Sequence, residues 1–166
     1  MRRLVVFLCV LVTFVPAHQV SAASLHPSAP ETLVSAPGKQ VATIIIGKIN
    51  LSAPIFVGNT DAIFDRGVGQ WPGTPAAGKK GNLVLGGHRT SANAPFLNIH
   101  KLKSGDIISI VVKKKTFKYK VTGHSIVKPT AVWITNQTST PTLTLYSCHP
   151  LGKVSHRYVV RAVLTA

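Results

Sequence analysis

The chain has 166 residues, and its 19 Lys and Arg against four Asp and Glu give a formal net charge of +15 at pH 7. Four carboxylates are too few to build a calcium site from clustered acids, which excludes proteins that depend on such a site. So positive a protein is attracted to polyanions.

The N-terminal residues 1–23 have the layout of an export signal. Arg2 and Arg3 precede the apolar stretch Leu4–Val15, and small residues follow up to Ala23. The stretch is shorter than the about 20 residues of a membrane helix, which favours a cleaved signal peptide over an uncleaved signal anchor. For an exported protein the polyanions are an anionic membrane or a wall polymer, not nucleic acid. We therefore expect an extracytoplasmic location at the outer face of the membrane.

Residues 24–38 are rich in proline and lack hydrophobic periodicity, which predicts a flexible tether. The remaining residues, 39–166, are enough for one domain with a single core. Without Arg2 and Arg3, 17 basic residues against four acids leave +13. Cys9 lies within the predicted signal, so Cys148 is the only cysteine of the domain, and a disulfide within the domain is excluded.

The rest of the chain reads mainly as β-strands. Its β-branched and aromatic runs are bounded by Gly, Pro, Asn and Lys, which is typical of an all-β sandwich or barrel. Lys113–Lys115 falls where a solvated hairpin turn is expected, and only 93–103 shows a helical pattern, with Asn93 as its cap and Phe96 and Ile99 on one face. We predict a small all-β barrel with one or two short helices. The predicted strands are 41–50, 83–87, 107–113, 116–127, 142–147 and 158–164.

Cys148 ends the apolar run that begins at Thr142. A single unpaired thiol in an exported chain is either incidental or a nucleophile. A nucleophilic cysteine needs a partner that lowers its pKa or accepts its proton, and histidine is the usual partner. His149 is a poor candidate, because adjacent side chains on an extended strand point to opposite faces.

His88 is the better candidate for that partner. It ends the predicted strand just before a polar loop, and Gly86 and Gly87 leave room beside it for another backbone or a substrate. The two histidines of the signal and tether are excluded. We expect His100 on the predicted helix and His124 at a strand end to be surface residues.

The scarcity of acids suggests that a third catalytic group is cationic. Arg157 and Arg161 are four residues apart in the last predicted strand, so both side chains lie on one face. Arg157 is nearer the loop that follows Cys148, and its fork of donors can hold a carbonyl oxygen that becomes negative during acyl transfer. Either arginine could instead be a solvated surface residue.

Several segments together resemble the sortases, the cysteine transpeptidases of the Gram-positive surface. The resemblance covers 43–162 and is closest to class E, with class D next. It departs at Ser147, where the family usually has Thr; the hydroxyl is retained, and we expect a modest effect. The similar motifs, in chain order, are Gln70-Trp-Pro-Gly-Thr74, Gly81-Asn-Leu-Val-Leu-Gly-Gly-His-Arg-Thr90, Ala94-Pro-Phe-Leu97, Thr144-Leu-Tyr-Ser-Cys148 and His156-Arg-Tyr-Val-Val-Arg-Ala162.

The resemblance implies a closed barrel of about eight strands and a role for each candidate residue. Cys148 would be the nucleophile, His88 the general acid and base, and Arg157 the group that stabilises substrate and oxyanion. The enzyme would cleave an LAxTG or LPxTG sorting signal of a surface protein between Thr and Gly. It would pass the acyl group to a peptidoglycan precursor amine or a pilin lysine, without a cofactor or metal.

The groove for the sorting signal would include Ser147 and the segment 130–141. In that segment Trp133 and Ile134 are able to hold an apolar leucine of the signal, although a core position for Trp133 is equally open. A zinc site of Cys148, His149 and His156 lacks a fourth ligand, and its adjacent first pair is awkward.

Two other functions fit parts of the sequence. A basic β-barrel module could bind anionic wall polymer or membrane without catalysis, in which case Cys148 would be buried and inert. A cysteine peptidase or an L,D-transpeptidase would act on peptidoglycan itself. The order of His88 before Cys148 and the absence of a Ser-x-Gly-Cys motif speak against that alternative.

Overall fold

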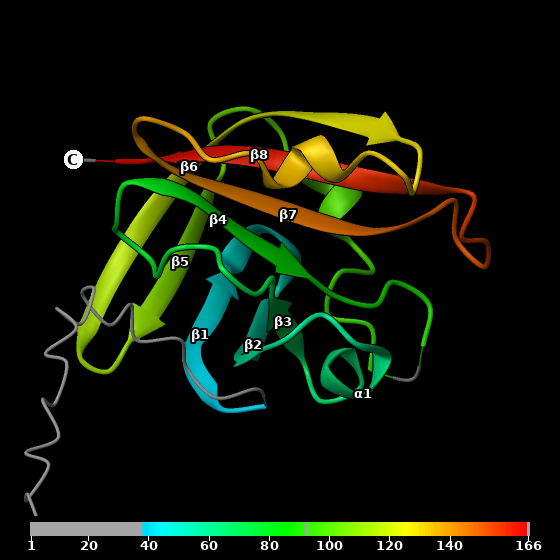
Figure 1. Ribbon diagram of the computed structural model, residues 1–166, viewed down its shortest axis with the longest axis horizontal. Coiled ribbons are helices and arrows are strands. Elements are labelled where there is room, and N and C mark those ends of the chain that lie inside the picture. The colour runs from blue at the N-terminus through cyan, green and yellow to red at the C-terminus, as the bar shows by residue number, and fades with distance from the viewer. Residues whose placement is uncertain (1–37, 92, 166) are drawn as a thin grey trace, which may run out of the picture. The chain divides into compact units, whose positions relative to one another are not determined.

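The computed structural model describes residues 38–91 and 93–165, which form a closed β-barrel (Figure 1). The predicted signal over 1–23, the predicted tether up to residue 37 and Cys9 lie outside the described residues. Around the barrel the strands follow the order β1-β2-β3-β4-β7-β8-β6-β5. Their bounds are β1 Gln40–Ile46, β2 Leu51–Val57, β3 Val68–Gln70, β4 Gly81–Gly86, β5 Ile107–Val112, β6 Lys115–Val127, β7 Pro141–His149 and β8 His156–Leu164.

The pairing of the strands decides which loops meet. β4 and β7 run parallel, with Gly86 opposite Tyr146, so both strands end at the same edge of the sheet. β7 and β8 run antiparallel, and His149 lies opposite His156. The end of β4, the end of β7 and the start of β8 therefore come together at one end of the barrel, which also carries the short helix α1 (Asp61–Phe64) in Figure 1.

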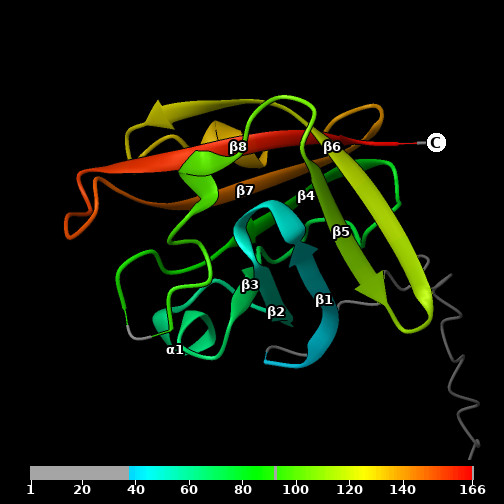
Figure 2. The same cartoon turned by 180° about the vertical axis from the view of Figure 1, so that it is seen from behind.

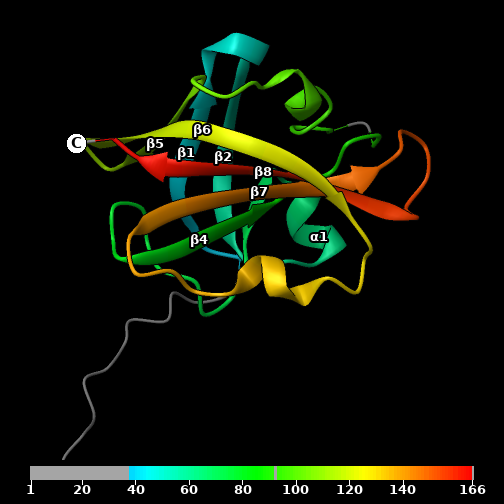
Figure 3. The same ribbon diagram turned by 90° about the horizontal axis from the view of Figure 1, so that it is seen from above.

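The core fills the barrel, and a smaller apolar layer covers its outside. The buried side chains of the interior include Leu83 and Leu85 of β4. On the outer face Val84 packs with Tyr146, Val159 and Ile134, the last from the 3-10 helix η3 (Val132–Thr135), which lies along β4 and β7 in Figure 3. β4 is buried on both faces, which explains the three consecutive apolar side chains Leu83, Val84 and Leu85.

All six predicted strands are present, and the prediction of an all-β barrel is confirmed. β2, β3 and α1 are additional. The predicted helix over 93–103 is wrong, because only the 3-10 helix η2 (Ile99–Lys101) forms there. The buried side chains of this segment, Phe96, Ile99 and Leu102, are three residues apart, a spacing that a 3-10 helix shares with an α-helix.

The turn predicted at Lys113–Lys115 is confirmed. Lys113 and Lys114 connect β5 to β6, with Val112 opposite Lys115, and Lys113 has a φ of 53°. A further 3-10 helix, η1 (Gly47–Ile49), joins β1 to β2. The compact unit Thr32–Ala166 holds the whole barrel and its core, so it is a self-contained folding unit.

Candidate active site

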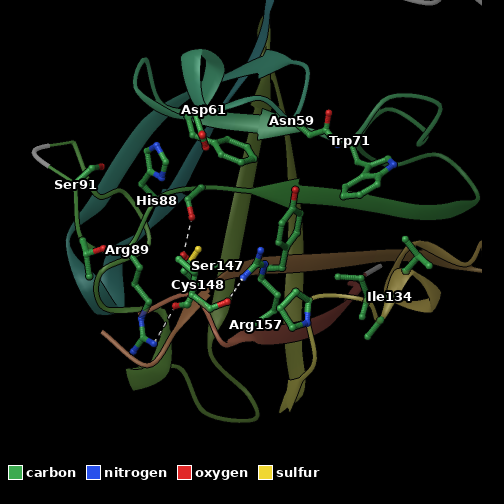
Figure 4. Close-up of a pocket in the computed structure, with 18 residues that line it drawn as sticks. Asn59, Asp61, Trp71, His88, Arg89, Ser91, Ile134, Ser147, Cys148 and Arg157 are labelled. Atoms are coloured by element: carbon green, nitrogen blue, oxygen red, sulfur yellow. Dashed lines mark hydrogen bonds between the residues drawn. The ribbon is translucent and has the colours of Figure 1, made fainter. Parts of the chain in front are cut away.

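A cleft of about 620 Å³ opens at the end of the barrel where β4 and β7 finish. Figure 4 shows Cys148 beneath His88 and beside Arg157 on its wall. The three residues predicted to carry the chemistry therefore meet in one cleft. Its lining consists of Asn59, Asp61, Phe64, Trp71, Gly87, His88, Arg89, Thr90, Ser91, Pro129, Ala131, Val132, Ile134, Tyr146, Ser147, Cys148, Val154 and Arg157.

Strand register sets Cys148 and Arg157 side by side. The two residues are directly opposite each other in the β7–β8 ladder, so their side chains project from the same face of the sheet. The neighbouring pair on that face is Tyr146 and Val159, and both belong to the outer apolar layer. Cys148 is partly exposed, as a thiol that meets a substrate must be.

The guanidinium of Arg157 is positioned by backbone carbonyls. Its Nη1 donates to the carbonyl oxygens of Val154 and His156, each at 3.1 Å. Burial raises the pKa of Tyr146 far above its usual range, and the nearby charge of Arg157 acts in the opposite direction. Tyr146 therefore presents a neutral hydroxyl to the cleft, and Arg157 supplies a positive charge there.

His88 lies in the loop after β4 and faces the other wall of the cleft. Its Nε2 is 3.2 Å from Oδ1 of Asp65, and its ring meets the edge of Phe64 at a centroid distance of 5.6 Å. The backbone carbonyl of His88 accepts a hydrogen bond from Phe96 N at 3.0 Å. Asp65 contacts only Nε2, so the other ring nitrogen, Nδ1, does not contact this carboxylate.

Ser147 and Gly86 allow close contact between β7 and the end of β4, where the loop that carries His88 begins. The hydroxyl of Ser147, which is 2% exposed, donates to the carbonyl oxygen of Gly87 at 2.6 Å. A Cβ on Gly86 would lie 2.5 Å from the ring of Tyr146. The space that was expected beside the glycines for a backbone or a substrate is thus filled at Gly86 by an aromatic side chain of β7.

Arg89 is a cation in the wall of the cleft, with 3% of its surface exposed. Its Nη1 lies 2.9 Å from Nδ1 of His149 and 3.5 Å from the carbonyl oxygen of Cys148, and its Nε donates to the carbonyl of Leu97. Burial lowers the pKa of His149, and the charge of Arg89 lowers it further. The Nδ1 of a neutral His149 can accept a hydrogen bond from Arg89 Nη1, so this pair ties β7 to the loop that carries Arg89.

The segment 130–141 forms a third side of the cleft. Asn82 holds it in place, because the buried Nδ2 donates to the carbonyls of Ile134 and Asn136 at 2.9 and 3.1 Å. Ile134 lines the cleft and is 5% exposed. Trp133 is 51% exposed, carries the guanidinium of Arg161 over its ring at 5.5 Å and does not line the cleft. The core position left open for Trp133 is therefore wrong.

Sequence reasoning missed several residues of this site. Asp65 was not among the candidates, yet the fold brings it to His88. Arg89 was noted only as part of a motif. Its charge directly after His88, at the end of an apolar strand, was a signal that could have identified it. Trp71 and Tyr146 contact each other with a centroid distance of 5.9 Å and line the cleft. Both lie in the motifs quoted from the sequence, and strand alternation puts Tyr146 on the same face as Cys148, so both could have been candidates.

Within residues 38–91 and 93–165, no three histidine, cysteine or acidic side chains gather closely enough to hold a metal ion. Across the same residues, none of the helices has the length and apolar character needed to cross a membrane.

The Sortase domain family model matches residues 44–165, almost the whole of the barrel. The chain belongs to the sortase family. Sortase D of Bacillus subtilis is 29% identical over 74% of this chain and 63% of its own length. Sortase SrtE1 of Streptomyces coelicolor is 36% identical over 51% of this chain and 26% of its own length. Both classes to which the sequence was compared are thus represented among its relatives.

The solved structures agree with the sequence relatives. A sortase D5 transpeptidase from Clostridium perfringens superposes with a TM-score of 0.73 at 30% identity, over 79% of this chain and 82% of that one. The sortase resemblance is confirmed, as is the closed barrel that it implied. Sortases are extracytoplasmic, membrane-associated enzymes. The chain spans less than two thirds of the length of both curated relatives named above.

Proposed function

We propose that this sortase is a cysteine transpeptidase that cleaves an LAxTG or LPxTG sorting signal between Thr and Gly and transfers the acyl group to an amine. The observation that carries the proposal is the meeting of Cys148, His88 and Arg157 in one cleft. A binding module without catalysis is not favoured, because a merely structural thiol would be buried in the core, whereas Cys148 lines the cleft and is partly exposed.

In the first half of the reaction the Cys148 thiolate attacks the carbonyl carbon of the threonine. A C–S bond forms, and the oxygen of the tetrahedral intermediate carries the negative charge. When the C–N bond breaks, imidazolium His88 gives its proton to the departing glycine amine, and a thioester remains on Cys148.

In the second half an acceptor amine attacks the thioester carbonyl. His88 takes a proton from that amine, the C–S bond breaks, and the Cys148 thiolate is restored together with imidazolium His88. The acceptor is an amine of a peptidoglycan precursor or a pilin lysine. Water would compete for the thioester, and the apolar wall of Ile134 and Tyr146 lowers its access.

Arg157 is the candidate for stabilising the tetrahedral intermediate. It stands opposite Cys148 in the ladder, and two backbone carbonyls fix its guanidinium before a substrate arrives. Donors that are positioned in advance stabilise a developing oxyanion without reorganisation during the reaction. Arg161, the other arginine on this face, is engaged with Trp133 outside the cleft.

Asp65 has a positioning role in this scheme. A carboxylate at Nε2 of His88 orients the imidazole ring, so that Nδ1 serves the reacting atoms. Asp65 is 66% exposed, so water screens the interaction and its effect on the rate is modest.

The apolar part of the sorting signal fits the side of the cleft near η3. Ile134 and Tyr146 form a buried floor, while Val132 and Val154 are 64% and 67% exposed at its rim. An apolar leucine of the signal would cover this surface. Ser147 supports the groove through its hydrogen bond to Gly87. Trp133 would meet only parts of a substrate that extend beyond the cleft.

The partners of the enzyme are surface proteins with a C-terminal sorting signal and the acceptor that supplies the amine. The large positive charge also favours association with an anionic membrane or wall polymer. We place the enzyme at the outer face of the membrane.

The test uses purified Thr32–Ala166 and quenched fluorescent peptides that contain LAxTG or LPxTG, with and without a glycine amine. We expect cleavage between Thr and Gly, an amine-exchanged product, and loss of both with Cys148→Ala. Intact peptides together with a Cys148 thiol that does not react with a methanethiosulfonate would contradict the proposal. Mass spectrometry of the thioester intermediate identifies the acylated residue.

A further inference from the structure

Exposed lysines gather at the end of the barrel where the β5–β6 hairpin turns. β1 pairs with β5 so that Thr43 lies opposite Val111, which brings the start of β1 beside the hairpin turn. We call this group the lysine end. Its members, all exposed, are Lys79, Lys80, Lys113, Lys114, Lys115 and Lys118.

Contacts between distant segments hold these lysines at one end. The backbone N–H of Gly78 donates to the hydroxyl of Tyr119 at 2.8 Å, which fixes the loop that carries Lys79 and Lys80 against β6. A small apolar pocket is lined jointly by Val41, Ala77 and Val112, from the start of β1, this loop and the end of β5. The lysine end is therefore one surface of the folded barrel.

This surface lies away from the cleft. Lys80 directly precedes β4, whereas His88 follows it, and Lys118 is beside the C-terminal end of β8, whereas Arg157 is near its start. Figures 1 and 2 place the β5–β6 turn and α1 on opposite sides of the molecule. The barrel thus has a lysine end and a catalytic end.

The acidic residues lie away from the lysine end. Among the described residues the carboxylates are Asp61 and Asp65, at α1 beside the cleft, and Asp106, at the start of β5. Nowhere in the described part of the chain does a lysine form an ion pair within 4.0 Å of a carboxylate. The charge of the lysine end is therefore not neutralised within the domain.

The backbone at the hairpin turn favours other residue types than lysine. Lys113 has a φ of 53°, a conformation that Gly, Asn and Asp adopt more readily and that costs about 1 kcal/mol for other residues. Two lysines nevertheless form the turn and a third follows it. The conformation of the turn does not favour lysine, so a function for the positive charge would explain why lysines occupy it.

The chemistry of the surface matches a layer of headgroups. Lysine is a flexible point charge that does not select one planar anion, unlike arginine. None of the large exposed apolar side chains lies between Lys113 and Lys118, so insertion into the acyl layer is not expected.

We propose that the lysine end is a docking surface for an anionic phospholipid bilayer, and that it leaves the cleft at the opposite end exposed. The attraction is electrostatic, with each lysine near the headgroups contributing about fivefold to the partition constant at low salt. Docking requires no catalytic step, so it is independent of the proposed transpeptidation.

The test measures sedimentation of Thr32–Ala166 with vesicles of phosphatidylglycerol and phosphatidylcholine at low salt. A triple variant, Lys113→Asn with Lys114→Gln and Lys115→Gln, removes three charges from the lysine end. The matched control, Lys101→Gln with Lys103→Gln and Lys153→Gln, removes three exposed lysines elsewhere. We expect the first variant to lose roughly 100-fold in binding and the control to lose less than about fivefold.

Equal losses in both variants would show attraction by net charge alone and would overturn the docking surface. So would binding to pure phosphatidylcholine as strong as to the anionic mixture, or binding to a soluble polyphosphate but not to vesicles, which would identify a polymer as the partner. Both variants must keep the wild-type Tm. Peptide cleavage is measured separately, so loss of docking and loss of the proposed activity are distinguishable.

A second measurement tests the orientation directly. In Cys148→Ala, a cysteine replaces either Lys114 at the lysine end or Ser91 beside the cleft, and each carries a polarity-sensitive fluorophore. We expect anionic vesicles to change the emission of the label at 114 and to leave the label at 91 unchanged. The reverse pattern would show that the cleft faces the bilayer and would overturn the proposal.

Discussion

The two walls of the cleft are held in place in different ways. Strands β7 and β8 form the strand wall, where a shared ladder sets Cys148 opposite Arg157. The loop wall consists of α1 and the loop after β4, where His88 and Asp65 depend on a few individual contacts. The strand wall is the more rigid support, because loops with few buried contacts open locally at a lower free-energy cost.

The strand wall carries the nucleophile and the oxyanion donor, and the loop wall carries the residue that moves protons and the carboxylate that positions it. The nucleophile and the oxyanion donor must keep their distance within a fraction of an ångström, which a strand ladder provides. His88 has to move protons in both directions, and a loop position permits small movements. The predictions below test this division, in order of decreasing expected effect.

Replacing His88 by Gln should lower kcat/KM for peptide cleavage on the order of 10⁴-fold, because the leaving amine would lack its proton donor. Stopped-flow fluorescence with the quenched peptides measures the loss. Cys148 should still react with a methanethiosulfonate, which serves as the control for an intact cleft. A loss of less than tenfold would show that another group donates the proton.

Arg157→Ala should lower kcat by about 10² to 10³, the effect typical of removing one oxyanion donor. Arg161→Ala is the matched variant, since it removes an arginine from the same strand face outside the cleft. We expect the latter to stay within about twofold of wild type. Equal losses in both variants would assign the effect to general charge and not to Arg157.

Asp65→Asn should lower kcat/KM by about tenfold, and Asp106→Asn, which removes the same charge far from the cleft, should leave it unchanged. Without the carboxylate the imidazole ring is less well oriented toward the reacting atoms, so kcat should fall while KM stays nearly unchanged. A change in KM alone would contradict the positioning role. Asp65→Glu should recover most of the activity.

The contact between Arg89 and His149 should make stability depend on pH. Burial and the Arg89 charge lower the pKa of His149 in the folded protein, so protonation favours the unfolded chain. The stabilisation is complete above the unfolded pKa of about 6.5 and is lost as pH falls through the folded value. We expect Tm to fall by a few degrees between pH 7.5 and 5. His149→Gln should flatten this part of the curve, and an unchanged slope would exclude His149 as its source.

Much of the strand wall could be predicted from sequence. The run from Thr142 to Cys148 and the run after His156 are β-branched, apolar and bounded by turn residues, so their strands followed from local pattern. The four-residue spacing of Arg157 and Arg161 placed both side chains on one face, and the structure shows them on the face of Val159. Their separate contacts, one with the cleft and one with Trp133, did not follow from spacing.

The loop wall was largely unpredicted. β2 contains Pro54 and β3 has only three residues, so neither gave a clear strand pattern. The segment 93–103 looked helical because its apolar residues recur every three residues, a spacing that an α-helix and a 3-10 helix share, and the chain forms only η2 there. Asp65 and His88 are far apart in sequence, and only the parallel pairing of β2 with β3 brings α1 to the cleft.

The sequence by itself determined the fold class, the family motifs and the three candidate groups Cys148, His88 and Arg157, because strand periodicity and motif spacing are local properties of the chain. The tertiary structure alone decided that Asp65 meets His88 and that Arg89 holds His149. It also decided that Ile134 lines the cleft and that the lysines share one end of the barrel. These features depend on barrel closure, which sets the order and register of strands that are distant in sequence.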